Sequence, residues 1–402
     1  MNAQQSEDGT TQATITVDGE EVKGISGFSV SLDIMQMGDP FSLTVPNPRG
    51  KWTKKLTPGK KIELHLQNPN VSGGKKTLMH TGRIIAQDIS CELGAGTVIQ
   101  LQCADLGWHI MNEYPKPHER LEERTYGDLL DWATQESTWG IKGVTADSET
   151  SRKIRLSQAG GRAVAEAAAS DSLIIFQAQV EAGMSLGAML VMYAKRFNKL
   201  VNMSPDGYIQ IFEPNYRQKP KYRLDLHEFD DPDSVRNNLL SAGVTRSVET
   251  RYSKVTVVGQ IVGYSLYDPY GYNPGKFLGY AEAKGDDAPP FKHEFSKGDG
   301  EVYDPKWAPY AAGWELKRGL FDAFEARVKV RGHWQRYGGT TSWWISDTIA
   351  ECHLDPLGID GNFYVSSVRL NRDRGGDTTD VTLRKKDLLS TNFINVVTGK
   401  VG

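Results

Sequence analysis

Residues 360–389 read DGNFYVSSVRLNRDRGGDTTDVTLRKKDLL, and this stretch decides how the rest of the chain is interpreted. Two runs rich in β-branched and aromatic residues flank a break at Gly375-Gly376. Val381 and Leu383 alternate with polar neighbours, so one face of the second run is apolar. The pattern predicts a β-hairpin close to the end of the chain.

A similar hairpin pattern occurs near the start of the chain, over residues 81–106. A strand-like run with the pattern Glu-x-His-Leu precedes each copy, at residues 63–66 and 351–354. The sequence therefore predicts a duplicated small β-domain, and chance similarity between hairpins is the alternative. One register aligns five pairs of positions: Thr97 with Thr379, Ile99 with Val381, Leu101 with Leu383, Asp105 with Asp387, and Leu106 with Leu388.

Length and composition set the broad class of the protein. A chain of 402 residues predicts two to four domains, and its hydrophobic content of 39% and charged content of 24% are typical of a globular protein. The net charge of −3 gives no overall basic field for nucleic acid. Cys91, Cys103 and Cys352 have no CxxC spacing, which indicates reduced thiols in a protein made in a cytosol. No signal peptide or membrane insertion is expected.

The order of patterns predicts an α+β, mainly β fold. Alternating apolar residues predict about six strands between residues 13 and 108, spaced as in a small antiparallel β-barrel or sandwich. We expect two related small antiparallel β-barrels with an α/β module between them and an insertion in the second barrel. The expected domains are a flexible tail at 1–12, a first barrel at 13–108, a helical α/β module and connector at 109–232, and a second barrel at 233–402 with the insertion at 263–320.

The clearest helix begins after Ser185, which is expected to cap it. The helix is predicted to end near Asn202, and Asp206-Gly207 then turns the chain into a strand at residues 208–212. Six apolar residues fall on one face at helical spacing and predict a core contact: Leu186, Met189, Leu190, Tyr193, Phe197 and Leu200.

The predicted insertion carries aromatic residues among Gly, Pro and Asp. An exposed loop of this composition suits a protein contact, while a small folded subdomain with its own core is an equal alternative. The candidate partner-contact residues in it are Tyr264, Tyr267, Tyr270 and Tyr272.

A basic patch without an acid among its members lies between Arg49 and Lys61. A solvated loop is the favoured interpretation. A loop that faces an acidic partner or passing nucleic acid is the alternative, and it makes Lys54, Lys55, Lys60 and Lys61 candidate partner-contact residues.

The sequence contains no complete catalytic motif, so the chain is not expected to be an enzyme or to hold a cofactor or metal. Residues 73–77 resemble a phosphate-binding loop, but Pro69 replaces the required earlier glycine and Lys76 stands where a hydroxyl must bind magnesium. The histidines form no His-Glu-x-x-His motif, and there is no Gly-x-Ser-x-Gly elbow. Paired acids lie in connector or insertion sequence, without the apolar setting that acid catalysis requires.

Several weak motifs occur in a fixed order along the chain, at residues 56–59, 62–66, 81–84, 104–106, 184–200, 206–211, 355–365 and 379–389. Taken in this order, they resemble the baseplate hub family of contractile phage tails, such as that of phage Mu, and the related late control and type VI spike hub proteins. The resemblance touches most of the chain, and its signal is the order of motifs that are weak singly. Residues 330–334 lack the proline that the family often carries before its last barrel.

The resemblance implies a homotrimeric structural hub in the virion baseplate, a late protein assembled in the host bacterial cytoplasm. Three chains with two barrels each would form a ring of six that adapts a three-fold spike to a six-fold tail tube. Its implied partners are other copies of itself, the tail spike protein, the tail tube or tube-initiator protein, and the wedge proteins of the baseplate. DNA would pass through the ring during ejection without specific binding.

Two other functions compete with the hub. The first is a tail-associated cell-wall hydrolase, which would need an acid or metal-ligand set that the sequence does not show. The second is a carbohydrate-binding β-protein that uses the aromatic stretch at Tyr264–Tyr280 as a stacking surface.

Overall fold

The computed structural model describes residues 11–92, 96–115, 120–125, 132–135, 137, 141, 144–146, 174–179, 183–196, 199–228, 233, 237–259, 278–283, 287–299 and 307–389. The predicted tail at 1–12 lies almost wholly outside these residues. The chain divides into two compact units, one made of the residues up to 242 with 328–382 and one made of 243–327 with the residues from 383 on.

The N-terminal half of the main sheet is built from alternating strands whose apolar side chains are buried. Val30, Val45, Ile62 and Ile99 are fully buried, as their alternation with polar residues requires. The strands run in the spatial order β3-β4-β7-β6-β5-β1-β2. Their bounds are β1 Gln12–Val17, β2 Glu20–Val22, β3 Gly27–Asp33, β4 Pro40–Pro46, β5 Lys61–Gln67, β6 Thr77–Glu92 and β7 Gly96–Asp105.

The C-terminal half of the sheet repeats this order. Its path is β14-β18-β23-β22, and β21 and then β13 continue from β22. The hairpin of β19 (Trp334–Tyr337) and β20 (Thr340–Trp343) accompanies this half. The strand bounds are β13 Tyr222–Leu226, β14 Leu239–Arg246, β18 Phe324–Arg331, β21 Thr348–Leu354, β22 Ile359–Asp373 and β23 Gly376–Arg384.

The predicted duplication is visible in this strand order. β7 and β23, which carry the five aligned positions, both lie third in their halves, and β5 and β21, which carry Glu-x-His-Leu, both lie fifth. The sixth strands differ in direction, because β1 pairs with β5 antiparallel whereas β13 pairs with β21 parallel. The structure confirms an α+β, mainly β fold built from two related β-halves.

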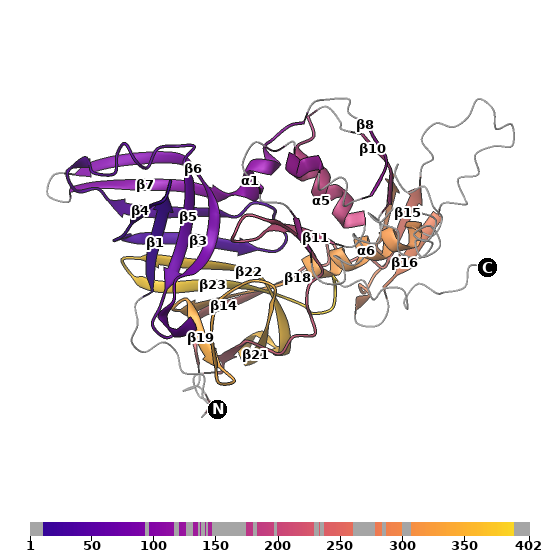
Figure 1. The fold of residues 1–402 in the computed structure, drawn as a ribbon. Helices are drawn as coiled ribbons and strands as arrows, with labels where there is room; N and C mark the ends of the chain where they lie inside the picture. Colours follow the sequence, from indigo (N-terminus) through magenta and orange to yellow (C-terminus); the bar gives the residue numbers. More distant parts are fainter. Residues whose placement is uncertain are drawn as a thin grey trace. The chain divides into compact units, whose positions relative to one another are not determined.

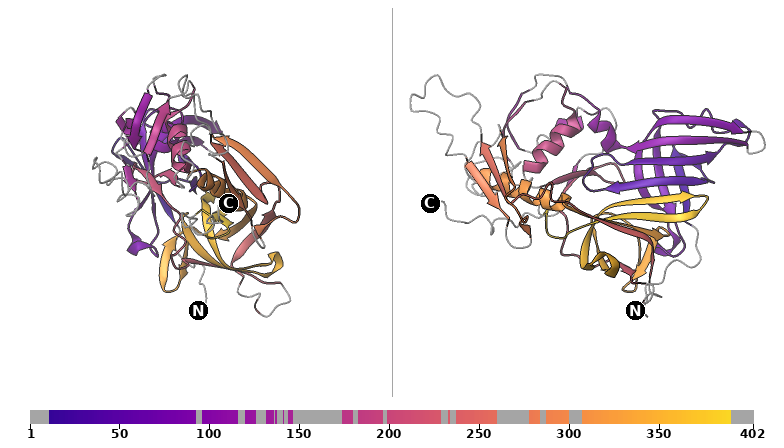
Figure 2. Two further views of the ribbon diagram at one scale, coloured as in Figure 1. Left: turned by 90° about the vertical axis from the view of Figure 1, so that its right-hand side faces the viewer. Right: turned by 180° about the vertical axis from the view of Figure 1, so that it is seen from behind.

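The two halves are joined edge to edge instead of being separate. β22 pairs antiparallel with β3, from Ser367 opposite Asp33 to Arg372 opposite Phe28. Segments that lie more than three hundred residues apart in sequence are therefore neighbours, seen as yellow strands beside indigo ones (Figure 1) and again from behind (Figure 2). Within the described ranges, no strand pairing closes either half into a barrel.

A small α/β module follows the first half. Ser185 accepts a hydrogen bond from the backbone N–H of Ala188 at 3.2 Å, which confirms it as the cap of helix α5. The helix ends at Arg196, earlier than predicted, and Leu200 begins a strand because it pairs with Phe212. The module comprises α1 Leu106–Met111, α5 Leu186–Arg196 and the sheet of β11 Leu200–Met203, β12 Ile209–Phe212 and β9 Val144–Ala146; β8 Arg120–Thr125 pairs separately with β10 Ile174–Gln179.

The described part of the predicted insertion is folded. Strand β15 (Lys254–Gly259) pairs with β16 (Leu278–Glu282) and β17 (Glu294–Asp299), and helix α6 (Trp307–Asp322) packs against this sheet. A Cβ atom on Gly279 would lie 2.0 Å from the carbonyl carbon of Ala308, so glycine is what allows the helix to approach β16. These described residues form a folded subdomain, but its core also includes β15, which precedes the predicted insertion, and the candidate tyrosines of the aromatic stretch lie outside the described residues. The core consists of Val255, Val257, Ala281, Ala308, Ala312 and Leu316.

Candidate interaction surface

The four candidate lysines come together on the surface beside the β1–β2 turn. Three of them form ion pairs: Lys55 with Glu20 on β2, Lys60 with Asp18 in the β1–β2 turn at 2.9 Å, and Lys61 with Glu63 on its own strand at 2.8 Å. Lys54 is exposed in the same segment. The fold thus brings two acids of the β1–β2 hairpin to the patch and offsets part of its charge.

The segment that carries Lys54 and Lys55 is held in place by buried polar contacts. The side chain of Asn47, fully buried, accepts a hydrogen bond from the backbone N–H of Trp52 at 2.8 Å and donates one to Thr53 at 2.9 Å. Gln87 on β6 donates to the carbonyl of Thr53 at 3.2 Å. The lysines are therefore presented from a fixed loop, and their role as partner contacts stays a prediction.

The candidate residues Tyr264, Tyr267, Tyr270 and Tyr272 lie outside the residues that the structure describes. Their role as partner contacts likewise stays a prediction. Among the described aromatic residues of the same unit, Tyr252 stacks on Phe295 with ring centroids 5.0 Å apart, whereas Tyr280 and Phe291 are exposed.

Two buried histidines contact the strands that join the two halves. His80 on β6 donates from Nε2 to the carbonyl of Ser31 on β3 at 2.8 Å, and its ring stacks on Phe41. The ring nitrogen Nε2 of His333 similarly donates to the carbonyl of Asn371 on β22 at 2.8 Å. Burial lowers the pKa of His80 to about 4 and lowers that of His333, so both rings are neutral at pH 7. These rings act as packing and hydrogen-bonding groups at the junction.

A cavity of about 700 Å³ lies where the first half, the α/β module and the β19–β20 hairpin meet. Most of its lining is apolar, including Ile34, Met79, Ile211 and Trp343. Its buried acid, Asp39, already accepts hydrogen bonds from the backbone N–H of Asp33 at 3.1 and 3.2 Å. Asn202, also in the lining, donates to the carbonyl of Asp33 at 3.0 Å, so both polar groups connect segments around the cavity.

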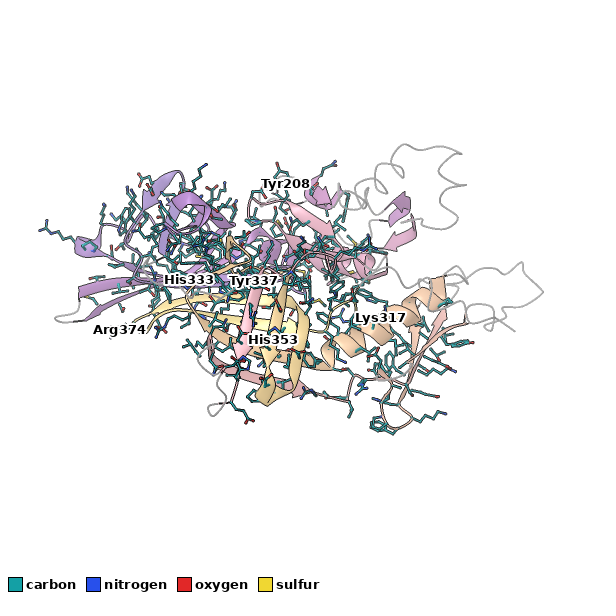
Figure 3. All side chains as sticks on the ribbon, turned by 90° about the horizontal axis from the view of Figure 1, so that it is seen from below. Tyr208, Lys317, His333, Tyr337, His353 and Arg374 are labelled. Carbon is teal, nitrogen blue, oxygen red and sulfur yellow. The ribbon has the colours of Figure 1, made fainter. Side chains whose placement is uncertain are left out.

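Tyr337 and His353, both labelled in Figure 3, take part in a polar network on β21. Tyr337 donates a hydrogen bond to Glu351, and His353 contacts Asp360 at 2.7 Å and Glu351 at 3.2 Å. Burial lowers the pKa of His353, but the hydrogen bonds to Asp360 and Glu351 outweigh it and raise the pKa overall. The Glu-x-His-Leu pattern therefore supplies charges that link β21 to β19 and β22.

Side-chain amides seal the outer edge of β13. Gln335 accepts from the backbone N–H of Arg223 at 2.9 Å and donates to its carbonyl at 2.8 Å. Asn238 accepts from the N–H of Asp225 at 3.0 Å, and Asn237 accepts from the N–H of His227 at 2.7 Å. These amides take the place of a neighbouring strand. Sequence analysis missed them because their partners lie as far as 112 residues away.

The buried acid Asp105 has a structural task. It caps helix α1 by accepting from the backbone N–H of Trp108 at 3.1 Å, and burial raises its pKa to about 6. In the part of the chain that the structure describes, no group of three or more His, Cys, Asp or Glu side chains is arranged to hold a metal ion. None of the described helices is long and apolar enough to cross a membrane.

The fold matches solved structures along nearly its whole length. A tail protein from Neisseria meningitidis superposes with a TM-score of 0.70 at 17% identity, covering 94% of this chain and 97% of that one. A 43 kDa tail protein of prophage MuSo2 from Shewanella oneidensis gives a TM-score of 0.66 at 17% identity over 94% and 99%. This chain has the fold of a phage tail protein.

The fold also matches part of a longer chain. A chain of the Francisella PdpA–VgrG complex superposes with a TM-score of 0.53 at 10% identity, covering 94% of this chain and 58% of that one. No protein-family model and no curated protein matches by sequence. The resemblance drawn from the order of weak motifs is thus confirmed at the level of the fold.

Proposed function

We propose that this chain is the structural hub of a phage-type tail baseplate. In this proposal it forms a homotrimeric ring that adapts a three-fold spike to a six-fold tail tube and lines part of the DNA ejection channel. The observation that carries it is the repeated strand order of the two halves, β3-β4-β7-β6-β5-β1 and β14-β18-β23-β22-β21-β13. Three chains with two similar halves offer six similar surfaces to a six-fold tube and three identical ones to a spike.

The described side chains support a structural task. In the first compact unit the buried Asp105 caps a helix, the buried Asp39 accepts from the backbone N–H of Asp33, and the buried His80 bonds a strand carbonyl. We propose that the protein is not an enzyme and works as a virion component in the baseplate, assembled in the host cytoplasm. Its proposed partners are the tail spike, the tail tube or tube-initiator protein, and the wedge proteins.

The charge pattern supports passage of DNA without tight binding. Phosphate contacts through unpaired lysines would slow a moving duplex, because each contact adds affinity by releasing counterions. Lys55, Lys60 and Lys61 are instead paired with acids. For this proposal we keep the division of the chain into the domains that the sequence predicts.

The native mass of the purified full chain tests the proposal. Light scattering over a concentration series is expected to give three times the chain mass of 44.6 kDa. A trimer that also binds a tail spike protein in a pull-down is the full expected result.

A strict monomer at every concentration, which stays monomeric when the spike protein is added, contradicts the hub proposal. Clearing of a cell-wall suspension by the pure protein would instead support the hydrolase alternative.

A further inference from the structure

We propose that copies of this chain join head to tail by strand addition, with β14 of one copy pairing antiparallel along the outer half of β6 of the next. The occupant of each open edge is thus a second copy of the chain. This inference deepens the proposed hub function, on which it rests, by naming the contact between copies.

The contact between the two halves inside one chain is the template. β22 is long enough to serve two partners on one edge, because residues 359–365 pair with β21 and residues 367–372 pair with β3. The first strand of one half thus adds to the outer part of the fourth strand of the other half. In the duplicated order, β6 corresponds to β22 and β14 corresponds to β3.

The outer half of β6 is open where β22 is occupied. β5 pairs with β6 only from Thr77 to Arg83, whereas β6 continues to Glu92. No strand in the described ranges pairs with the far part of this edge. Ile85 is 36% exposed and Ile89 is 41% exposed there. An open strand edge with exposed apolar side chains is a template for strand addition.

β14 is the complementary open edge. It ends the described order of the sheet, and Leu240 on it is 50% exposed. The backbone N–H of Ser247 donates to the carbonyl of Ala323 just beyond the end of β14. Because successive residues of a strand face opposite sides, the N–H groups of Leu240 and Ala242 then point away from β18.

The outer edge of β13 differs from the edges of β14 and β6 because side chains close it to strand pairing. Proteins normally protect exposed strand edges from pairing with other chains. Here the Gln335, Asn237 and Asn238 amides protect β13. On β6 the backbone hydrogen bonds of this edge extend to Ile84, and Gln87 contacts the carbonyl of Thr53 only through its side chain. Among the described residues, no strand covers the outer edge of β14 or that of β6 beyond Ile84. The two edges left open are those that the internal template predicts to meet.

Repetition of the β14–β6 contact determines how several copies assemble. Joining a β14 edge to a β6 edge uses different surfaces on the two copies, so the contact propagates head to tail. If the rotation between copies repeats that between the two halves, the sheet closes into a ring. Closure leaves no open edge of these two kinds, which accounts for their exposed apolar side chains.

Surface variants test the pairing by native mass. Leu240→Lys and Ile89→Lys each place a charge on one open edge without disturbing a buried side chain, and Ala242→Pro removes one outward N–H. Each is expected to weaken self-association at least tenfold while thermal unfolding changes little. Tyr114→Lys, at a side chain 64% exposed outside both strands, is the matched control and is expected to keep the native mass.

Cross-linking tests which strands meet. Cys91 is exposed on the outer half of β6, and Leu240→Cys adds a thiol on β14. A bismaleimide with a reach of about 10 Å tolerates a shift of about three residues along a strand. It is expected to link Leu240→Cys chains into dimers and trimers. The same variant with Cys91→Ser, and Tyr114→Cys with Cys91 intact, should stay unlinked.

The outcomes separate this inference from the hub proposal. A wild-type trimer that neither cross-links through Leu240→Cys nor loses mass in the lysine variants overturns the strand pairing and leaves the trimeric hub intact. A wild-type chain that is monomeric at every concentration, and stays so when the spike protein is added, overturns both.

Discussion

His80 shows how a single buried side chain ties stability to pH. Its pKa of about 4 in the folded protein lies below the ordinary value near 6.5, because burial disfavours the charged ring. As the pH falls from near 6.5 to about 4, this histidine binds a proton in the unfolded chain but not in the folded chain. The free energy of unfolding therefore decreases. The loss is about 1.4 kcal/mol for each pH unit.

We therefore expect His80→Gln to reduce the loss of stability in acid. Glutamine keeps a neutral N–H donor for the carbonyl of Ser31 but does not titrate. Between pH 7 and pH 5 the free energy of unfolding should shift in favour of the variant by about 2 kcal/mol, as measured by urea denaturation. Asp39 and Asp105, whose pKa values are raised by burial, act in the opposite direction in both proteins. A difference that is constant with pH contradicts the assignment.

Gly82 shows how a residue of the repeated hairpin is fixed by packing. A Cβ atom there would lie 1.9 Å from the carbonyl oxygen of Ala104 on the paired strand β7. We expect Gly82→Ala to destabilise the protein by about 3 kcal/mol or to prevent folding, because both backbones would have to separate. Gly243 on β14 has no atom within 4 Å of its Cβ position, so Gly243→Ala is the control. Similar melting temperatures for the two variants would contradict this account.

At the scale of elements, β13 depends on side chains for its outer hydrogen bonds. Asn238→Ala leaves the N–H of Asp225 without its acceptor in a buried setting, and we expect a loss of about 2 kcal/mol in chemical denaturation. The variant should also aggregate more readily, because it reopens a strand edge. The control is Asn112→Ala, which removes an exposed amide and should cost about 0.5 kcal/mol or less. Equal losses would show that the amides do not seal the edge.

Helix α5 separates what local sequence decides from what pairing decides. Its cap and its buried face follow from Ser185 and from the spacing of Leu186, Met189 and Tyr193, which are local signals. Its end does not, because the apolar spacing continues to Leu200. Pairing of Leu200 with Phe212 in β11–β12 overrides that spacing and ends the helix at Arg196.

At the scale of the whole molecule, the duplication explains why one sheet runs through both halves. A half that ends in an open strand can use the outer part of the fourth strand of its duplicate, as β3 uses β22. The expected trimer and the expected link between Leu240→Cys and Cys91 extend that rule from one chain to several. Native mass therefore tests whether copies associate, and cross-linking tests whether β14 and β6 are the strands that meet.

The sequence by itself determined the β-rich class, the duplicated hairpin, the cap of α5 and the turn at Asp206-Gly207. These features depend on residues within one strand, helix or turn, where periodicity and backbone preference act directly. It also predicted a folded subdomain as one of two alternatives for the insertion.

Only the tertiary structure decided the rest. It joined β3 to β22, paired the lysine patch with acids from the β1–β2 hairpin, and closed the edge of β13 with Gln335, Asn237 and Asn238. The β3–β22 pairing, the ion pairs and the Gln335 contact link segments that are distant in sequence, and Asn237 and Asn238 bond residues 10 and 13 positions away. Their partners are set by the path of the backbone through space, which leaves no periodic trace in either segment alone.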